Sequence, residues 1–188
     1  MRALCQFVLR LPLSTAMHKL SALIFLFAGL YVDAQTWQNR YDQPLHFTCG
    51  NRDSISMITS KHSNDAEDRV WGFSCQKTFD TQSECFWTNY VNYFDEQFTF
   101  NCPPNHVISG MDSFHNNDAE DRRWKFYCCR ANNYCNSHCQ WTTYVNNFDE
   151  YFTWYVPGMN YLVGAQSYHD NGAEDRRWKY LYCLRNKC

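Results

Sequence analysis

The sequence lacks the motifs that mark most enzymes. It contains no His-Glu-x-x-His metal motif and no glycine-rich phosphate loop, and no serine or cysteine nucleophile recurs with its repeated histidines. Arg-Gly-Asp and Asn-x-Ser/Thr sequences are missing as well, which excludes these routes to integrin binding and N-glycosylation. With a formal net charge of −2, the chain gives no sign of a nucleic-acid partner. We therefore expect a protein that is not an enzyme.

Long apolar segments are scarce too. The one near the start, Leu20 to Val32, precedes a small-residue cleavage site at Ala34, as in a secretory signal peptide. It is too short to span a bilayer comfortably, which takes about 20 apolar residues. We therefore predict a signal peptide over residues 1–34, a secreted mature chain over residues 35–188, and no membrane span. The sequence leaves two candidate initiators, Met1 and Met17.

A ten-residue motif occurs three times and is the strongest signal in the chain. Its copies share His, Ala-Glu-Asp-Arg and Trp, and they run over His62–Trp71, His115–Trp124 and His169–Trp178. The three copies of its aspartate are 53 and 54 residues apart, so one structural unit is repeated. A second block, Trp87–Glu96, recurs at Trp141–Glu150, and Trp37 opens an incomplete first copy. We therefore predict a single domain made of three repeats, residues 35–80, 81–134 and 135–188.

Strands fit these repeats better than helices. The segments beside the motifs are short, rich in aromatic and β-branched residues, alternate with period two, and end at Asn, Asp, Gly or Pro. Period two predicts that one strand face carries Arg122, Trp124, Phe126 and Cys128, whereas the other carries Arg123, Lys125, Tyr127 and Cys129. The chain is therefore predicted to be all-β.

The cysteines indicate a disulfide framework. Of the 11 cysteines, Cys5 lies in the predicted leader, and the even number that remains suits an exported protein. Cys49 and Cys75 are the only cysteines of the first repeat, so we expect them to pair.

Repeat equivalence extends this pairing to the rest of the chain. Cys102 is the copy of Cys49, so it should meet Cys128 or Cys129, and Cys85 should take the other one. The predicted disulfides are Cys49–Cys75, Cys85–Cys128, Cys102–Cys129, Cys135–Cys188 and Cys139–Cys183.

The repeated acidic motif has three interpretations. In the structural one it forms a tight turn, because Asn and Asp favour turns. Its glutamates would then pair with half-buried arginines of the same copy, Arg69, Arg122 and Arg176, since an unpaired buried charge is costly. The structural residues in this interpretation are Glu67, Glu120, Glu174, Trp71, Trp124 and Trp178.

The second interpretation is a cation site, because hard ions such as calcium take carboxylate and carbonyl oxygens. Asp118, Glu120 and Asp121 are closely spaced in the second copy, but Gly172 replaces the first aspartate in the third copy. The motif also differs from a D-x-D-x-D-G calcium loop. We therefore expect no cofactor, with calcium as the one candidate.

The third interpretation is carbohydrate recognition, in which polar side chains bond hydroxyl or anionic groups and an aromatic ring offers a flat apolar face. A basic stripe on the strand face away from the motif tryptophans is suited to holding sulfates. Val70 and Gly72 interrupt the stripe in the first repeat, so we expect a sulfated-polymer site to be stronger in the second and third. The candidate ligand-binding residues are His62, Asp65, Asp68, Arg69, His115, Asp118, Asp121, Arg122, Arg123, Lys125, His169, Asp175, Arg176, Arg177 and Lys179.

With these motifs, residues 35–188 resemble the dermatopontin family. The resemblance rests on Asp68–Trp71, on Asp121–Trp124 followed by Cys128-Cys129-Arg130, and on Asp175–Trp178. The wording looks closest to the invertebrate branch that includes the horseshoe-crab haemagglutinin/amebocyte aggregation factor. The three repeats and the segment Cys102–Gly110 are also similar to the three-sheet prism of egg vitelline outer-layer protein, which implies a disulfide-stapled, β-prism-like fold with three-fold repeats. A β-trefoil is the alternative for a three-repeat all-β chain.

The resemblance implies a secreted protein that bridges cells, proteoglycans or collagen, and repeated weak sites gain by avidity. We predict an extracellular-matrix or adhesion protein of the haemagglutinin and aggregation-factor type. Its expected partners are glycans or sulfated proteoglycans, matrix proteins such as collagen, cell surfaces, and a second copy of itself. The alternatives are a structural matrix protein without lectin activity and a secreted cytolytic defence factor.

Overall fold

The computed structural model describes residues 36–188, and the predicted signal peptide lies outside them. These residues form eleven strands and no helix, which confirms the all-β prediction. Accordingly, this part of the chain has no helix long and apolar enough to cross a membrane. The strands are β1 (Leu45–Thr48), β2 (Asp53–Ser63), β3 (Asp68–Lys77), β4 (Glu84–Trp87), β5 (Phe98–Asn101), β6 (Val107–Asn116), β7 (Asp121–Arg130), β8 (Tyr134–Trp141), β9 (Phe152–Tyr155), β10 (Asn160–Asp170) and β11 (Asp175–Lys187).

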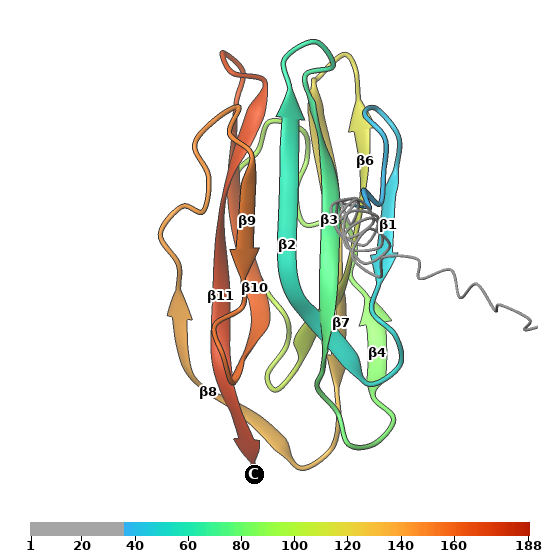
Figure 1. The fold of residues 1–188 in the computed structure, drawn as a ribbon, viewed down its shortest axis with the longest axis vertical. Helices are drawn as coiled ribbons and strands as arrows, with labels where there is room; N and C mark the ends of the chain where they lie inside the picture. Colours follow the sequence, from blue (N-terminus) through green and yellow to red (C-terminus); the bar gives the residue numbers. More distant parts are fainter. Residues whose placement is uncertain (1–35) are drawn as a thin grey trace, which may run out of the picture. The chain divides into compact units, whose positions relative to one another are not determined.

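Three antiparallel sheets make up the fold, and their long strands run along the long axis of the molecule (Figure 1). The strand orders are β1-β6-β7-β4, β3-β2-β9 and β5-β10-β11-β8. Each sheet is built on a hairpin of two long strands, β2–β3, β6–β7 or β10–β11, and each hairpin contains one register shift. Such bulges increase the local twist, which helps three sheets to wrap around one core.

Short strands join the sheets to one another. β1 precedes the first hairpin in the chain but pairs with β6 of the second, β5 pairs with β10 of the third, and β9 returns to β2 of the first. Each sheet is therefore completed by a strand from another predicted repeat, and separating two sheets would break backbone hydrogen bonds. The first sheet is narrower, because β3 has no partner corresponding to β4 on β7 or β8 on β11 within residues 36–188.

The acidic motifs form the turns of the three hairpins, as the structural interpretation predicts. In each turn the alanine N–H donates to a carbonyl three residues earlier, at 3.2, 3.3 and 3.1 Å. The next residue is left-handed, with φ of 45°, 44° and 45° at Glu67, Glu120 and Glu174. Side-chain oxygens of Asn116 and Asp170 accept backbone N–H bonds inside the second and third turns. Asn and Asp therefore act here through the local bonds that make them turn residues.

Three tryptophans meet at the centre of the core. Trp71, Trp124 and Trp178 are at most 1% exposed, and each packs edge-to-face on the other two, with ring centroids 5.0, 5.3 and 4.8 Å apart. Edge-to-face packing contributes about 0.5–1.5 kcal/mol per pair beyond the burial of area. The motif therefore supplies both the turn and the centre of the core.

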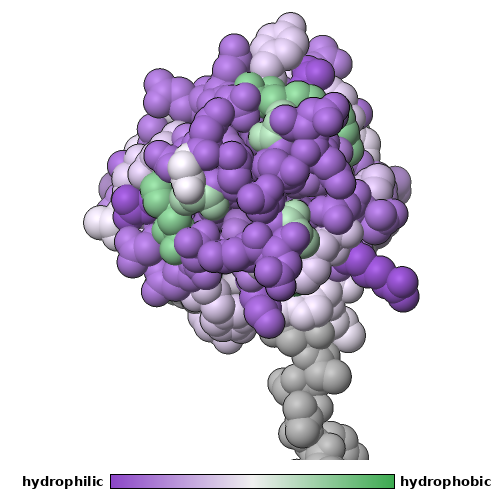
Figure 2. All heavy atoms as spheres, turned by 90° about the horizontal axis from the view of Figure 1, so that it is seen from above, coloured by the Kyte–Doolittle hydropathy of each residue, from purple (hydrophilic) through white to green (hydrophobic). Residues whose placement is uncertain are grey.

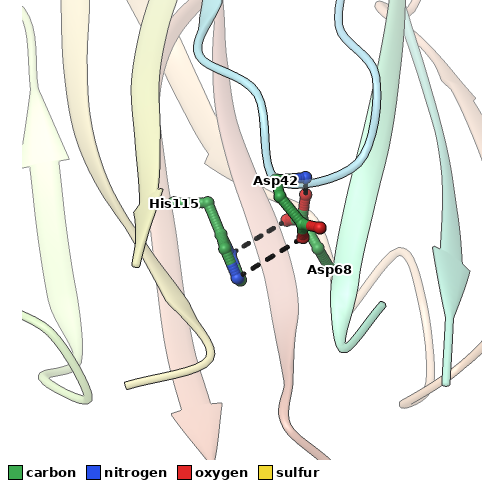
Figure 3. Close-up of side chains that lie close together, drawn as sticks. All are labelled: Asp42, Asp68 and His115. Carbon is green, nitrogen blue, oxygen red and sulfur yellow. Dashed lines mark hydrogen bonds and ion pairs between the residues drawn. The ribbon is translucent and has the colours of Figure 1, made fainter. Parts of the chain in front are cut away.

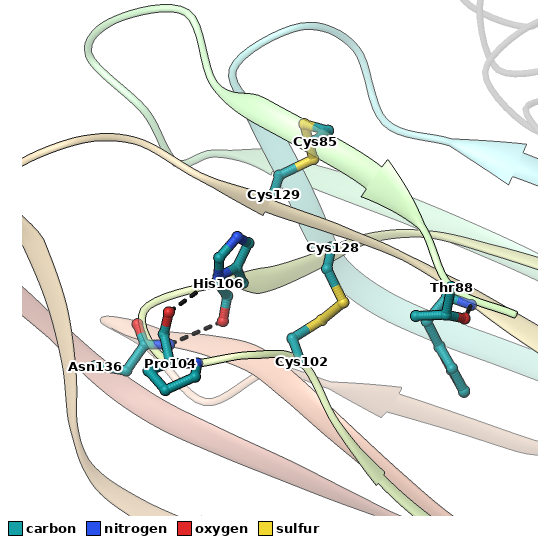
Figure 4. Close-up of a disulfide and its surroundings, with 9 residues drawn as sticks. Cys85, Thr88, Cys102, Pro104, His106, Cys128, Cys129 and Asn136 are labelled. Atoms are coloured by element: carbon teal, nitrogen blue, oxygen red, sulfur yellow. Dashed lines mark hydrogen bonds between the residues drawn. A yellow bond between two sulfur atoms is a disulfide. The ribbon is translucent and has the colours of Figure 1, made fainter. Parts of the chain in front are cut away.

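Five disulfides staple the strands. Three of them match the prediction: Cys49–Cys75, Cys135–Cys188 and Cys139–Cys183. The predicted pairs Cys85–Cys128 and Cys102–Cys129 are wrong, because Cys85 bonds Cys129 and Cys102 bonds Cys128 (Figure 4).

The alternation of β7 explains this exchange of partners. Cys128 shares the core face of β7 with Trp124, so it meets Cys102, which follows a strand of a neighbouring sheet. Cys129 lies on the opposite face, directly across from Cys85 in the β4–β7 register. Each cysteine therefore bonds the partner on its own side of the sheet.

Candidate functional site

The three acidic turns lie together at one end of the molecule, the upper end in Figure 1. Seen from that end, the surface is mostly hydrophilic, with small separate hydrophobic patches (Figure 2). A narrow cavity is lined by Glu, Asp, Arg and Trp side chains from all three copies of the motif. The fold therefore brings together residues that are more than 50 positions apart in the chain.

At this end, arginine–aspartate ion pairs link the three hairpins in a closed ring. The paired residues are Arg69 with Asp175 at 2.5 and 2.7 Å, Arg122 with Asp68 at 2.6 and 2.7 Å, and Arg176 with Asp121 at 2.6 and 2.6 Å. Each of these side chains belongs to a residue at most 4% exposed. Because every pair is bidentate and buried, the ring fixes how the hairpins sit against each other.

The arginines take aspartates of another hairpin as partners, rather than the glutamates of their own turn. The arginine of each motif reaches one neighbouring hairpin, and the preceding aspartate reaches the other. Glu120 and Glu174 instead lie 3.2 Å from Nε2 of His115 and His169. The expected pairing of motif glutamates with motif arginines is therefore wrong, whereas the need of a buried arginine for a carboxylate is met.

A histidine covers each of these aspartates. Nδ1 of His115 lies 3.4 Å from Asp68, and its Nε2 lies 3.7 Å from Asp42, which precedes β1 (Figure 3). The backbone N–H of Asp42 also donates to Asp68 at 2.8 Å. The other two hairpins repeat this geometry, with His62 at 3.4 Å from Asp175 and His169 at 3.4 Å from Asp121. The ring is therefore a network of aspartates, arginines and histidines rather than three isolated pairs.

The network holds its carboxylates in the ionised form. Burial alone would raise the pKa of Asp121, but hydrogen bonds from His169 and Arg176 outweigh it and lower the pKa to about 2. The pKa of Asp175 is lowered to about 2 in the same way. Burial would lower the pKa of His169, yet its hydrogen bond to Asp121 raises it, and the pKa of His115 is raised likewise.

Two groups of potential metal ligands among the described residues do not suit a calcium ion. Ligand atoms lie within 4.8 Å of one another in two groups: Asp42, Asp68 and His115, and His62, Asp149 and Asp175. In each group the buried aspartate already accepts two hydrogen bonds from an arginine, whose charge repels a cation. Calcium also takes oxygen ligands, whereas each group offers a histidine nitrogen. The arrangement has the chemistry of an ion-pair network.

Apart from Arg123 and Arg177, which are half-buried, the candidate ligand-binding residues of the motif divide into two classes. Asp65 and Asp118 are exposed on the turns. The motif's aspartates before Arg, its first arginines and its histidine side chains are buried in the network. A ligand could reach only the first class without opening the fold.

The predicted basic stripe lies on the face of β7 away from the core. The guanidinium carbon of Arg123 is 4.7 Å from the ring centroids of both Tyr90 and Tyr93, and its Nε donates to the carbonyl of Asn92 at 3.0 Å. The ammonium of Lys125 lies 4.2 Å from the Tyr90 centroid. A single such cation–π contact contributes about 0.5–1 kcal/mol at an exposed site.

β11 carries a second face of the same kind. The guanidinium carbon of Arg177 is 4.5 Å from the Tyr144 centroid, and its Nε donates to the carbonyl of Asn146 at 3.0 Å. The ammonium of Lys179 is 4.4 Å from the same ring. We call these two surfaces, Arg123 and Lys125 with Tyr90, and Arg177 and Lys179 with Tyr144, the basic faces. They lie on different sheets.

The sequence analysis did not predict a role for three buried asparagines. Each donates from its side chain to the carbonyl of a ring arginine at 2.9–3.1 Å, and each accepts the backbone N–H of a core tryptophan at 2.9 Å; they are Asn39, Asn92 and Asn146. Their signal was available, because each stands three residues before an aspartate with the same 53- and 54-residue spacing. The asparagines tie the loop before each short strand to the hairpin behind it.

This correspondence also corrects the alignment of the first repeat. Trp37 stands two residues before Asn39, as Tyr90 stands two residues before Asn92. Trp37 is therefore the counterpart of Tyr90, and not of Trp87 at the start of the second block.

The comparisons with known proteins agree with this framework. A model of the dermatopontin family matches residues 39–188. The chain belongs to the dermatopontin family. Among its relatives, the hemagglutinin/amebocyte aggregation factor of Limulus polyphemus is 42% identical over 169 residues, which are 89% of this chain and 98% of the relative.

Two further relatives carry different names. Millepora cytotoxin-1 of Millepora dichotoma is 39% identical over 145 residues, which are 77% of this chain and 65% of that protein. A dermatopontin of Biomphalaria glabrata is 35% identical over 141 residues, which are 75% of this chain and 95% of that protein. No solved structure matches the chain. None of the relatives' names denotes an enzyme.

In this dermatopontin-family chain, the motif that carried the resemblance forms the ion-pair ring and the tryptophan core. The residues that carry the resemblance therefore belong to the framework of the fold. Differences in binding among such chains have more room on the outer faces, where side chains reach solvent.

Proposed function

We propose that this protein is secreted and acts outside cells as an adhesion protein that binds glycans or sulfated proteoglycans and bridges cells or matrix. The observation that carries the proposal is the pair of basic faces on β7 and β11. Because they lie on different sheets, one molecule offers two ligand surfaces, and two-point attachment is what bridging requires.

The chemistry of the basic faces suits a sulfated sugar. Lys125 and Lys179 are half-buried beside a tyrosine ring, so a sulfate can take a charge-assisted hydrogen bond from each ammonium. Tyr93, which borders the β7 face, is 67% exposed and offers an aromatic surface to the sugar.

Secretion is supported by the disulfide framework and by the predicted signal peptide over residues 1–34. Five disulfides suit an oxidising compartment. Adhesion is supported by the printed name of the Limulus relative, an aggregation factor. We also propose that the three predicted repeats of this chain form a β-prism. The proposal is supported by the arrangement of the strands in three separate sheets, whereas a β-trefoil has a barrel.

Agglutination of erythrocytes tests this function. We expect the secreted protein to agglutinate cells, and dextran sulfate to inhibit this more strongly than neutral dextran. The double variant Lys125→Ala/Lys179→Ala should raise the minimum agglutinating concentration on the order of tenfold, which corresponds to about 1.4 kcal/mol. The matched control is Lys77→Ala/Lys187→Ala, which removes the same charge from exposed lysines outside the basic faces.

Equal agglutination by both double variants would contradict the assignment of the basic faces. Absence of agglutination, together with binding to collagen, would favour a structural matrix protein. Lysis without prior clumping would favour a cytolytic factor, the activity suggested by the name of the Millepora relative.

A further inference from the structure

The outer face of the first hairpin differs from the two basic faces. At the position of Arg123 the first hairpin has Val70, which pairs with Lys61 across the β2–β3 ladder. On the second hairpin, Arg123 pairs with Phe114 in the corresponding place. Gly72 stands where β7 has Lys125. The first hairpin therefore lacks the arginine, the lysine and the aromatic residue that cover this surface on the second.

These differences matter because the covering side chains fill an aromatic slot. On the second hairpin, the ring of Phe114 packs edge-to-face on Tyr90 and Phe94, with centroids 5.2 and 5.5 Å apart, and the guanidinium of Arg123 lies 4.7 Å from Tyr90. On the third hairpin, Tyr168 packs in the same way on Tyr144. The protein thus fills two of the three slots with its own side chains.

In the first repeat, the described residues leave the same slot open. Trp37 and Tyr41 occupy the positions of Tyr90 and Phe94, and both are half-buried. A groove of about 780 Å³ is lined by Trp37, Arg40, Tyr41, Lys61 and Val70, together with Gln38 and Asn39. This volume falls within the usual range of small-molecule sites, about 300–1,000 Å³.

We propose that this groove is a binding site for an acidic saccharide, with a sugar ring against Trp37 and a sulfate or carboxylate held by Arg40 and Lys61. The site rests on the proposed glycan-binding function and differs from the basic faces in its location and its openness. We name it the first-repeat groove.

Charge selects the class of ligand. Arg40 and Lys61 are both exposed, and among residues 36–188 no acidic residue lines the groove, so it favours an anion and disfavours the cation that fills the other two slots. The flat rings select a ligand with an apolar face as well as acidic groups, which a pyranose with a sulfate or carboxylate provides. A simple inorganic anion would use the two basic residues but not Trp37 or Tyr41.

The groove adds a site in the repeat where the basic stripe predicts the weakest one. The stripe predicts a stronger site in the second and third repeats, because Arg and Lys are absent from the first. In the structure, the guanidinium groups of Arg123 and Arg177 contact tyrosine rings and donate hydrogen bonds to backbone carbonyls of their own chain. The first repeat has Val70 in place of that arginine, so its aromatic surface is open to a ligand.

The chain itself provides the design of the test. Val70→Arg copies the second and third hairpins into the first, so we expect the new arginine to cover Trp37 and to weaken binding at least tenfold. Trp37→Ala and Lys61→Ala should each weaken it on the order of tenfold by removing the stacking surface or the charge. Lys61→Ala changes an exposed side chain, so it remains informative if Val70→Arg fails to fold.

The probe is a chondroitin sulfate tetrasaccharide, with its desulfated and carboxyl-reduced form as the neutral control. Calorimetry on the secreted protein gives affinity and stoichiometry, and Trp37 adds a fluorescence change on binding. A poly-glutamate peptide serves as a competitor of a different class.

The outcomes separate this site from the basic faces. Fewer tetrasaccharides bound per chain in Val70→Arg and Lys61→Ala, with the groove's affinity unchanged in Lys125→Ala/Lys179→Ala, supports the groove. The reverse pattern overturns the groove and leaves the proposed function in place. If poly-glutamate competes as well as the tetrasaccharide, or if the neutral sugar binds equally, the acidic-saccharide assignment is wrong. Absence of tetrasaccharide binding in a protein that still agglutinates cells also overturns the groove.

Discussion

The inner and outer positions of β3, β7 and β11 behave differently, although they alternate along the same strands. The inward positions carry the same arginine and tryptophan on all three strands, each within the ring or the core. The outward positions carry Val70 and Gly72 on β3 but Arg and Lys on β7 and β11. In a closed ring, changing one member leaves a buried charge on a neighbouring hairpin without its partner. An outward residue contacts only groups near it on the surface. The framework is therefore uniform, and the surface is where the repeats differ.

Breaking the ring should have the largest effect. Asp121→Asn removes the carboxylate that pairs with buried Arg176, and an unpaired buried charge costs about 3–5 kcal/mol. We expect a large fall in melting temperature and poor secretion, measured by thermal unfolding and by the amount of protein in the medium. Asp118→Asn, an exposed change on the same turn, should stay within about 0.5 kcal/mol of the parent. Equal stability of the two variants would show that the ring is dispensable.

Removing a tryptophan-linked asparagine should have the next effect. Asn92→Ala leaves the N–H of Trp124 and the carbonyl of Arg122 without their side-chain partner in the interior, at a cost of about 1–3 kcal/mol for a buried unpaired group. Denaturant unfolding measures the loss. The matched control is Asn89→Ala, at an exposed position three residues earlier, which should be close to neutral. A neutral Asn92→Ala would mean that the loop before β5 is held by other contacts.

The ring also predicts how stability depends on pH. The pKa of Asp121 and Asp175 is about 2 in the folded protein against an ordinary 3.8, so their contribution is complete above about pH 4 and is lost as pH falls toward 2. The pKa of His115 and His169 is raised above 6.5, so their contribution is complete below that value and is lost as pH rises through the raised pKa. The melting temperature should therefore be highest between about pH 4 and 6.5.

Each acidic group accounts for about 2 kcal/mol by the size of its pKa shift. Thermal unfolding across pH 2–9 checks both arms. His115→Gln/His169→Gln should flatten the alkaline arm and also weaken the acid arm, because His169 helps to lower the pKa of Asp121. A melting temperature that continues to rise above pH 7 would contradict the raised histidine pKa values.

Changes on the outer face should have the smallest effect on stability. Arg123→Val removes cation–π contacts with two tyrosines and one backbone hydrogen bond, so we expect a loss of about 1 kcal/mol. Chemical unfolding of Arg123→Val beside the parent protein checks this. A loss of several kcal/mol would place Arg123 within the framework.

Much of the local structure followed from the pattern of residues. The period of two and the Asn and Asp clusters gave strands and turns in the observed places, because these depend on neighbours in the chain. The repeat spacing also indicates the observed disulfide partner of Cys85, which the prediction missed. Cys85 and Cys139 are 54 residues apart, as are Cys129 and Cys183, which makes the bond Cys85–Cys129 the counterpart of Cys139–Cys183.

The candidate site was less predictable. The sequence identified the charged residues of the motif but could not show that the carboxylate of Asp68 faces Arg122 of the next repeat rather than Arg69 beside it. Partner choice depends on how β1, β5 and β9 cross to other sheets, and no local pattern encodes that pairing.

By itself, the amino-acid sequence determined the strands, the turns, the three copies of the motif and the chemistry available at each position. Only the tertiary structure decided which of those groups are buried and which remain open to a ligand. The strand exchange turns the motif inward as a closed ion-pair ring, because buried charges must be paired. It leaves Trp37 uncovered in the first repeat, because Val70 is too short to lie over the indole ring as Arg123 and Arg177 lie over tyrosine rings.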